Sequence, residues 1–345
     1  MKAISLPAPG EVEIVDIPEP QLGSEDVMVE IRYVGLCGSD LGMYRGTFAI
    51  GTYPRIPGHE VSGTIVARGA QVPDSIREGE RVTLWPYSEC GICPACRQGR
   101  VNTCQFNQTL GLQRDGAMAE RFAIHYSKVF SSQVLTLKEL TLVEPMSVGY
   151  HAANRGRVSE VDSVLVLGCG TIGMGAIAAS VRKGATVIVA DIDDGKLELA
   201  VRFGALHTIN STQQDLLAEV ARLTHGEGVS VAIEAVGLPQ TFRLAVEAVA
   251  FGGRVVYVGY AKKEVCYDTS CFVRKELDIL GSRNALRVFP AVIGMLERRQ
   301  QPFKDLITKV YPLSRTEQAF RDWDMAPGKF AKILIKVDNA NDDSP

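Results

Sequence analysis

Four of the eight cysteines lie between residues 90 and 104, where they could bind a metal. They are Cys90, Cys93, Cys96 and Cys104, in the pattern C-x-x-C-x-x-C-x₇-C. Four thiolates suit tetrahedral zinc, with Zn–S distances of about 2.3 Å, and a site filled by protein ligands is structural rather than catalytic. The surrounding segment is rich in turn-forming residues and has no apolar face. The alternatives are a disulfide pair or a redox C-x-x-C, although redox motifs normally use two cysteines.

A second candidate metal group lies nearer the start of the chain. Cys37 occurs in the segment GLCGSD, and His59 and Glu60 follow a proline-rich stretch. All three residue types are good zinc ligands. Three protein ligands would leave a coordination position for water or substrate. From spacing alone the group is only a candidate, because a histidine before a glutamate can also be a satisfied surface pair.

A glycine-rich segment indicates a dinucleotide site. It follows an apolar run, precedes a helical stretch and reads G-x-G-x-x-G, with the site residues Gly168, Gly170, Thr171, Ile172 and Gly173. Asp191 ends the next apolar run, as the dinucleotide fingerprint requires. An acid there accepts from ribose hydroxyls and repels a 2′-phosphate, which favours NAD over NADP. The alternatives are an ordinary glycine-rich turn and a solvated strand-end acid, and the nearby Arg182 and Lys183 leave some NADP use open.

The elements that would position these residues show two different hydrophobic patterns, one in the first part of the chain and one in the second. Short alternating runs at residues 27–35, 61–69 and 80–86 are broken by Gly and Pro, which predicts a β-rich antiparallel barrel or sandwich. From residue 160 onward, continuous apolar runs such as DSVLVLG and TVIVAD alternate with helical stretches. That alternation predicts an α/β fold with a doubly wound parallel sheet.

The last part of the chain is predicted to return to the first lobe. A helix (FPAVIGMLERRQ) precedes the strands ITKVYPL and AKILIKV, which are expected to be antiparallel. The final residues, DNANDDSP, are polar and acidic and are expected to fray.

Composition excludes several other classes of protein. The net charge is −3 and the pI about 6.0, so no basic field favours nucleic acid. No apolar run approaches the ~20 residues that span a bilayer, and the first residues lack a signal-peptide pattern. The scattered cysteines Cys37, Cys169, Cys266 and Cys271 favour a reducing compartment. We therefore expect a cytoplasmic protein with no membrane partner.

Together these motifs resemble the zinc-dependent medium-chain alcohol dehydrogenase family. Residues 58–72 fit its signature G-H-E-x-x-G-x₅-G-x-x-V, and GLCGSD, the four-cysteine lobe, LVEPMSVGYHA and the late G-x-G-x-x-G occur in the family's order over nearly the whole chain. The segments CGSD, VEP with SVG, and GSRNA are similar to the sorbitol dehydrogenase branch, which includes bacterial polyol and sugar-acid dehydrogenases.

The resemblance implies an oxidoreductase with two domains. Residues 1–150 and 287–345 would form a GroES-like β-rich catalytic domain, with a structural zinc lobe at 88–105, and residues 151–286 a Rossmann domain. Two zinc ions per subunit are implied. The structural zinc would be held by the four clustered cysteines, and the catalytic zinc by Cys37, His59, Glu60 and, directly or through water, Glu144.

Further roles follow from the same resemblance. Ser39 falls where the family has the hydroxyl that takes the substrate proton, and Asp40 where an acceptor orients the ring of the metal-bound histidine. Arg283 falls near the nicotinamide, and Lys332 where late strands supply a basic cofactor contact. One position departs from the family: Gly42 replaces a histidine that often relays the proton, so water or a cofactor ribose hydroxyl is expected to carry it instead.

The implied reaction moves a hydride from a secondary alcohol to NAD, helped by the Lewis acidity of zinc. Four arginines, Arg45, Arg55, Arg114 and Arg283, lie in segments that could border the substrate. Because arginine can clamp a carboxylate, we hypothesise a sugar acid such as a hexonate, oxidised at C5; the alternative is that these are surface arginines.

Two other functions stay open at this point. One is an L-threonine 3-dehydrogenase, which shares the Cys, His and Glu set, and the other is a non-catalytic NAD-binding sensor or structural protein. The resemblance also implies a homodimer or homotetramer.

Overall fold

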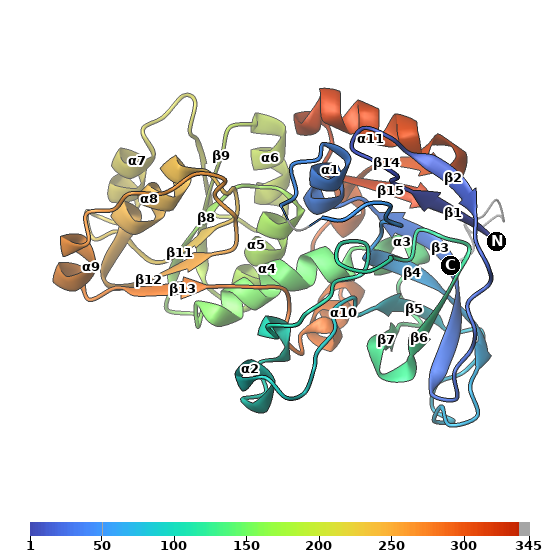
Figure 1. The fold of residues 1–345 in the computed structure, drawn as a ribbon. Helices are drawn as coiled ribbons and strands as arrows, with labels where there is room; N and C mark the ends of the chain where they lie inside the picture. Colours follow the sequence, from blue (N-terminus) through green and yellow to red (C-terminus); the bar gives the residue numbers. More distant parts are fainter. Residues whose placement is uncertain (50, 338–345) are drawn as a thin grey trace. The chain divides into compact units, whose positions relative to one another are not determined.

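The computed structural model describes residues 1–49 and 51–337, so the predicted frayed tail at residues 338–345 lies outside the described residues. The chain forms two compact units, coloured along the sequence in Figure 1. Unit 1 comprises Met1–Glu144 and Phe289–Pro345, and unit 2 comprises Pro145–Val288. Helix α4 (Val143–Arg155) runs through the first boundary. No helix in the described part of the chain has the length and apolar character that a membrane span needs.

Unit 1 is built on a 7-stranded sheet. Along the sheet the strands are β14 (Ile307–Pro312), β15 (Lys332–Lys336), β3 (Asp26–Gly35), β4 (Glu60–Arg68), β5 (Arg81–Leu84) and β7 (Val129–Ser131), and β6 (Arg121–His125) also pairs with β3. A separate antiparallel pair is formed by β1 (Lys2–Ser5) and β2 (Glu13–Asp16). The helices are α1 (Gly38–Tyr44), α2 (Pro94–Arg97), α3 (Leu137–Leu140), α10 (Phe289–Glu297) and α11 (Thr316–Met325), with 3₁₀ turns η1 (Val101–Thr103), η2 (Tyr126–Lys128), η3 (Phe303–Leu306), η4 (Leu313–Arg315) and η5 (Pro327–Lys329).

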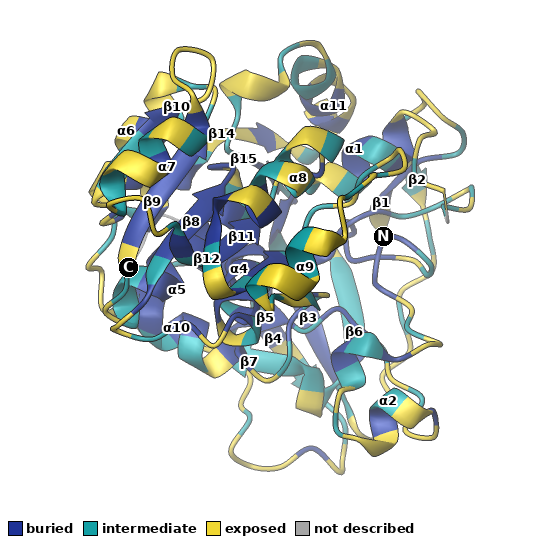
Figure 2. Cartoon of the chain, turned by 90° about the vertical axis from the view of Figure 1, so that its left-hand side faces the viewer, coloured by how far each residue is buried: buried dark blue, intermediate teal, exposed yellow. Residues whose placement is uncertain are grey.

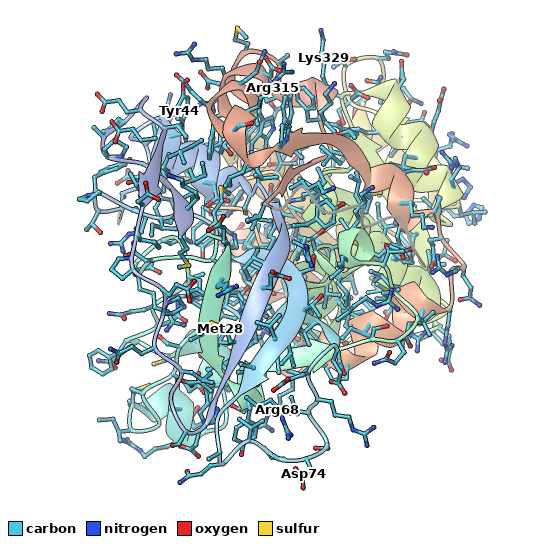
Figure 3. The ribbon with its side chains drawn as sticks, turned by 90° about the vertical axis from the view of Figure 1, so that its right-hand side faces the viewer. Met28, Tyr44, Arg68, Asp74, Arg315 and Lys329 are labelled. Carbon is cyan, nitrogen blue, oxygen red and sulfur yellow. The ribbon has the colours of Figure 1, made fainter. Side chains whose placement is uncertain are left out.

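Strand β3 lies at the centre of this sheet, and its neighbours pair with it as the alternating pattern predicts. Strand β3 is long and almost wholly buried; Val27, Val29 and Ile31 belong to the hydrophobic core, and Met28 between them is buried on the other face. At one end of the sheet, Arg68 donates to the carbonyl oxygen of Ile76 and lies near Asp74 (Figure 3). The pairs β3–β4, β4–β5 and β5–β7 are antiparallel, as the alternating pattern predicts.

The late strands only partly follow the prediction. Strand β15 does pair antiparallel with β3, which joins the late segment to the early one. Strands β14 and β15, however, are parallel to each other, so the antiparallel prediction is wrong for that pair. Parallel neighbours need a crossover, which α11 supplies. Helix α11 packs on α1 through stacked rings of Tyr44 and Phe320, whose centroids lie 5.2 Å apart.

Unit 2 is a 6-stranded parallel sheet with helices on both sides (Figure 1). Along the sheet the strands are β10 (His207–Asn210), β9 (Thr186–Asp191), β8 (Ser163–Leu167), β11 (Val229–Glu234), β12 (Val249–Tyr257) and β13 (Asp278–Gly281). The helices are α5 (Thr171–Arg182), α6 (Asp194–Arg202), α7 (Leu216–Leu223), α8 (Pro239–Ala248) and α9 (Ser270–Lys275).

The strand order of unit 2 determines where a ligand can bind. Counted from β8, the spatial order is 3-2-1-4-5-6, which is the Rossmann order. Strands β8 and β11 are buried, while the helices that cover them expose their outer faces (Figure 2). Ligands of such sheets bind at the carboxyl ends of the strands where the order reverses, here between β8 and β11.

Candidate active site

Three of the predicted metal ligands lie where two paired strands meet. Cys37 follows the end of β3, Glu60 is the first residue of β4, and His59 directly precedes it. The register places Gly35 directly opposite Glu60. A Cβ atom on residue 35 would lie only 2.2 Å from a carboxylate oxygen of Glu60. A glycine is therefore needed for the Glu60 side chain to lie over this position.

The donor atoms of Cys37, His59 and Glu60 form one compact group. They all lie within 4.8 Å of one another, a spacing that lets one ion contact all three. His59 is 4% exposed and Glu60 1%. Asp40 lies behind them: its Oδ1 is 3.8 Å from His59 Nδ1, and its Oδ2 accepts a 2.8 Å hydrogen bond from the backbone N–H of Cys37. Asp40 thus bonds to the backbone of Cys37, whereas its Oδ1 and Nδ1 of His59 lie beyond hydrogen-bond distance and have no partner among the described residues, so its role in orienting the His59 ring stays a prediction.

The charges around this group favour a bound cation. Burial alone would lower the pKa of His59, but the negative charges of Asp40 and Cys37 outweigh burial and raise it well above its ordinary value. At Glu144 burial raises the pKa of the carboxyl, and the charge of Glu60 adds to the rise. The raised pKa values of His59 and Glu144 both reflect buried anionic groups that lie close together. A divalent ion would offset their negative charge, so the residues fit zinc.

Lys332 does not lie where the resemblance placed it. The predicted cofactor contact is wrong, because Lys332 is 5% exposed and its Nζ donates to both carboxylate oxygens of Glu60, at 2.6 and 2.7 Å. A third bond, of 2.9 Å, goes to the carbonyl oxygen of Leu36. These acceptors use all three ammonium protons. Lys332 is therefore a fixed counter-charge in unit 1, brought there by the pairing of β15 with β3.

Tyr87 is a neighbour that the motifs did not indicate. Its hydroxyl donates a hydrogen bond to Oε1 of Glu144, and both side chains are buried. Burial and the charge of Glu144 raise the pKa of Tyr87 well above its ordinary value, so it stays a donor. Glu144 lies outside the compact group of three donors, and its role as a zinc ligand stays a prediction. A single tyrosine before a cysteine lobe carries no sequence signal for this contact.

Ser39 has the free hydroxyl that its predicted role needs. Its Oγ is buried and has no hydrogen-bond partner among the described residues. A buried hydroxyl without a partner is costly, which favours a partner supplied by substrate. Ser39 lies in the first turn of α1, two residues after Cys37. A Cβ atom at Gly42, on the same helix, would make only ordinary contacts, the nearest at 3.6 Å from Phe48.

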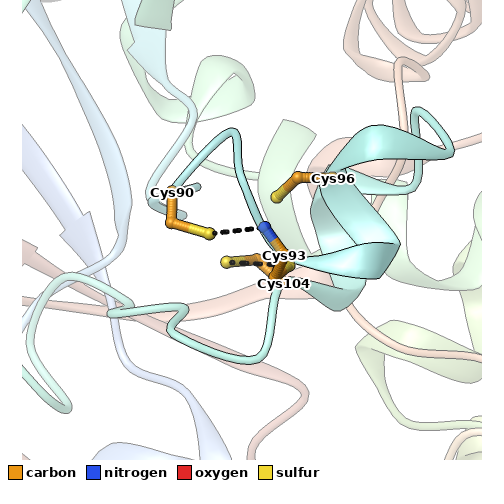
Figure 4. A group of neighbouring side chains, drawn as sticks. All are labelled: Cys90, Cys93, Cys96 and Cys104. Carbon is orange, nitrogen blue, oxygen red and sulfur yellow. Dashed lines mark hydrogen bonds between the residues drawn. The ribbon is translucent and has the colours of Figure 1, made fainter.

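The four clustered cysteines also converge in space (Figure 4). Their sulfur atoms lie within 4.8 Å of one another, and the sulfurs of Cys93 and Cys104 are 4.0 Å apart. All four are free thiols, which does not support the disulfide alternative. Backbone N–H groups of Cys96 and Gln105 lower the pKa of Cys93 to about 6, so a thiolate is present near neutral pH. The site fits a structural zinc ion.

We expect mild chelation to remove metal from the Cys37 group before the four-cysteine site. A carboxylate is a weaker donor than a thiolate, and both oxygens of Glu60 are shared with Lys332. Elemental analysis over time in chelator, alongside activity, should show a fast metal fraction that follows activity and a slow one that does not. A Cys90→Ser control should lose the slow fraction alone. Earlier release of that slow fraction would contradict the assignment.

The glycine-rich loop connects β8 to α5 as the fingerprint predicts. Gly168 has a φ of +97°, and a Cβ atom on Gly173 would lie 1.9 Å from the carbonyl oxygen of Gly168. Helix α5 can therefore start close to the loop only with glycine at both positions. Gly170 precedes the helix, and Thr171 and Ile172 form its first turn, whose free N–H groups suit a pyrophosphate.

Asp191 is held next to this loop. Its Oδ2 accepts a 2.6 Å hydrogen bond from the N–H of Cys169, and its Oδ1 accepts from the N–H groups of Ile192 and Asp193, at 2.8 and 3.1 Å. It ends β9, the neighbour of β8. A fixed carboxylate at this edge supports the predicted preference for NAD, because it repels a 2′-phosphate.

We expect Asp191→Asn to shift cofactor preference toward NADP. The amide keeps an acceptor for the N–H of Cys169 but removes the charge, so the ratio of kcat/KM for NAD to that for NADP should fall by about 10- to 100-fold. Steady-state kinetics with each cofactor measure this. Asp193→Asn is a matched control, because Asp193 accepts from the N–H of Lys196 at the start of α6 and asparagine caps equally well. An unchanged ratio in Asp191→Asn would refute the assignment.

The predicted arginines have different surroundings. Arg45 and Arg55 are paired with Asp324 and Asp115 on the surface of unit 1. Arg283 is exposed and follows β13, at the same sheet edge as the Gly-rich loop. Its cofactor role stays a prediction.

The two units together define a class of protein: a metal-dependent, dinucleotide-binding oxidoreductase. Residues 23–133 match the alcohol dehydrogenase GroES-like domain, and residues 171–298 match the zinc-binding dehydrogenase family. The sorbitol dehydrogenase of Bacillus subtilis is 35% identical over 343 residues, which is 97% of each chain. The L-galactonate-5-dehydrogenase of Escherichia coli is 30% identical over 306 residues, 88% of this chain and 89% of that protein. An E. coli CFT073 alcohol dehydrogenase solved with NADH is similar at a TM-score of 0.91 and 29% identity, covering 98% of this chain and 99% of that one.

The chain belongs to the zinc-dependent alcohol dehydrogenase family, with the polyol dehydrogenases. It is an oxidoreductase that uses zinc and NAD and acts on a small-molecule alcohol, and the relatives above are named for a polyol and a sugar acid. The L-threonine 3-dehydrogenase of Bacillus licheniformis is also similar, at 29% identity over 97% of this chain and 98% of that protein.

Proposed function

We propose that the chain oxidises a secondary hydroxyl of a polyol or sugar acid, and specifically C5 of a hexonate, with transfer of hydride to NAD. The compact group of Cys37, His59 and Glu60 carries the proposal, because a non-catalytic nucleotide-binding protein has no need of it. The similarity to L-galactonate-5-dehydrogenase supports a hexonate. The domain roles follow: unit 1 carries the chemistry and unit 2 binds the cofactor.

The residues of unit 1 bind and orient the substrate hydroxyl. A zinc ion held by Cys37, His59 and Glu60 would supply a Lewis acid that lowers the pKa of that hydroxyl. Asp40 holds the backbone of Cys37 in place by a hydrogen bond, and its carboxylate lies near Nδ1 of His59, where it would orient the ring of the metal-bound histidine. The unpartnered hydroxyl of Ser39 relays the proton, which then leaves through water or a cofactor ribose hydroxyl, since residue 42 is glycine.

The residues of unit 2 bind the cofactor. The first turn of α5 holds the pyrophosphate, and Asp191 accepts hydrogen bonds from the adenosine ribose. Arg283 contacts the nicotinamide half.

We propose in addition a cytoplasmic homodimer or homotetramer. Eight free thiols support a reducing compartment. Strand β13 is the last strand of its sheet, and Phe251, Val273 and Ile279 expose apolar side chains on or near β12 and β13, which supports pairing of two copies there. Light scattering of the purified protein tests the oligomeric state.

A substrate panel tests the proposed reaction. NADH absorbance should rise with hexonates and, more weakly, with the matching alditols, and should not rise with L-threonine. Turnover of L-threonine alone would favour the threonine dehydrogenase alternative. No turnover with any alcohol in zinc-loaded protein would refute the proposed function.

A further inference from the structure

A group of charged and aromatic side chains lies beside the candidate active site in unit 1. It consists of Trp85, Glu89, Arg114 and Lys128, and we call it the Arg114 cluster. Nζ of Lys128 donates to Glu89 at 2.6 Å and lies 4.2 Å from the centre of the Trp85 ring. Burial lowers the pKa of Lys128, and the charge of Arg114 lowers it further, so the two cations are near each other.

Arg114 forms no ion pair within the described part of the chain, although Glu89 lies near enough for its charge to favour the guanidinium cation. Its Nε is buried without a hydrogen-bond partner among the described residues, and burial lowers the pKa of its guanidinium. Both nearby acids are engaged by other groups. Asp115 accepts from Arg55 and from a backbone N–H, and Glu89 accepts from Lys128. The cluster therefore contains two cations and one carboxylate, so one positive charge is not balanced, which is unfavourable for half-buried groups.

Backbone hydrogen bonds fix the loop that carries Arg114, residues 110–118, against the active site. The N–H of Ala117 donates to the carbonyl oxygen of Gly58 at 3.0 Å, directly before the ligand His59. At the other end, the N–H of Leu110 donates to Pro86 at 3.0 Å, directly before Tyr87. Arg114 thus lies in a loop held between two segments of the active site.

Tyr87 contacts both the Arg114 cluster and Glu144, which lies beside the predicted metal ligands. Nζ of Lys128 donates to the carbonyl oxygen of Tyr87 at 2.9 Å, and the hydroxyl of the same tyrosine donates to Glu144. One tyrosine residue therefore spans from the Arg114 cluster to the buried acid beside the metal ligands. The two places are therefore separated by about the length of a tyrosine residue, which is comparable with a substrate of several carbons.

We propose that Arg114 binds the anionic end of the substrate, and that this end is a carboxylate. The inference rests on the proposed sugar-acid substrate and names the residue that selects the acid over the neutral polyol. A guanidinium binds a carboxylate through two parallel hydrogen bonds. The single excess positive charge of the cluster matches a carboxylate rather than a doubly charged phosphate.

Kinetics of Arg114→Met and Arg114→Lys on three compounds test this: a hexonate, its matching alditol and the phosphate ester of that alditol. Arg114→Met should lower kcat/KM for the hexonate by about 10- to 100-fold, mainly through KM, and leave the alditol within about twofold. Arg114→Lys should be intermediate, because lysine keeps the charge but loses the fork. Arg121→Met, which removes an exposed arginine paired with Glu19, is the matched control. It should leave kcat/KM for the hexonate and for the alditol unchanged. Thermal melting and zinc content should match the wild type in all variants.

Each result has a defined meaning. Undiminished hexonate turnover in Arg114→Met overturns the inference and leaves the proposed function intact. Equal losses on hexonate and alditol indicate a structural role and also overturn it. Turnover of the alditol alone by the wild type contradicts both the inference and the proposed acid substrate. Arg114-dependent turnover of the phosphate ester, but not of the hexonate, overturns the carboxylate assignment.

Discussion

Cys37→Ser should lower kcat by at least about a thousandfold while NAD binding and the fold are retained. A serine hydroxyl is neutral near pH 7 and is a poor zinc ligand, so the compact donor group loses its thiolate. Lewis acidity contributes several kcal/mol to such reactions, and about 4 kcal/mol corresponds to a thousandfold in rate. The cofactor loop and Asp191 lie in unit 2, so NAD affinity should be unaffected.

NADH formation, NAD titration and elemental analysis measure the three parts of this prediction. The variant should lose the fast, chelator-labile metal fraction and keep the slow one. Cys266→Ser is a matched control, because it changes an exposed thiol in unit 2 and should stay within about twofold of wild type. A Cys37→Ser variant with the kcat of the wild type would contradict the assignment, because the reaction would then not depend on the Cys37 group.

Lys332→Met should lower the free energy of unfolding of unit 1 by about 3–5 kcal/mol in the metal-free protein. The side chains of Lys332 and Glu60 are 4% and 1% exposed, so removal of the lysine leaves a buried carboxylate without its partner. A bound divalent ion would supply part of the missing positive charge, so the loss should be smaller after zinc loading. Urea unfolding followed by tryptophan fluorescence measures unit 1 alone, since both tryptophans, Trp85 and Trp323, lie in it.

A double variant separates two effects of Lys332→Met: the loss of the positive charge beside Glu60 and the loss of side-chain packing. In Glu60→Gln/Lys332→Met the carboxylate that paired with the lysine is neutralised as well, so stability should recover by several kcal/mol relative to Lys332→Met. Lys329→Met is the control for loss of an exposed lysine and should cost less than about 0.5 kcal/mol. A Lys332→Met protein as stable as this control would show that the buried pair contributes nothing to the fold.

The predicted site residues that the structure brings together are those whose proximity follows from local spacing or from strand register. Cys90 and its three partners lie within one loop, and Gly168 to Gly173 within one turn, so chain connectivity brings them together. His59 and Glu60 are adjacent in sequence. Cys37 lies near them because Gly35 pairs with Glu60. The alternating pattern of β3 and β4 predicts that the two strands pair, but it does not predict this register.

The sequence could not predict contacts made by side chains from distant segments. Lys332 reaches Glu60 across 272 positions, and a lysine on an apolar strand carries no sign of its partner. The contact of Tyr87 with Glu144 was missed for the same reason. The parallel pairing of β14 with β15 depends on α11, which the pattern of the late segment did not reveal. Among the arginines, only the structure distinguishes those with acidic partners from Arg114.

The contribution of β15 to unit 1 has a consequence for biosynthesis. Unit 2 is one continuous segment, so it can fold on the ribosome as soon as it emerges, as domains generally do. The Tyr33–Gly35 end of β3, by contrast, gains its neighbour only after translation has reached β15. Until then Glu60 has no lysine against it, although it and Cys37 were made hundreds of residues earlier. The nucleotide fold can therefore form first, and the catalytic ligand group reaches its mature charge balance only after β15 has been synthesised.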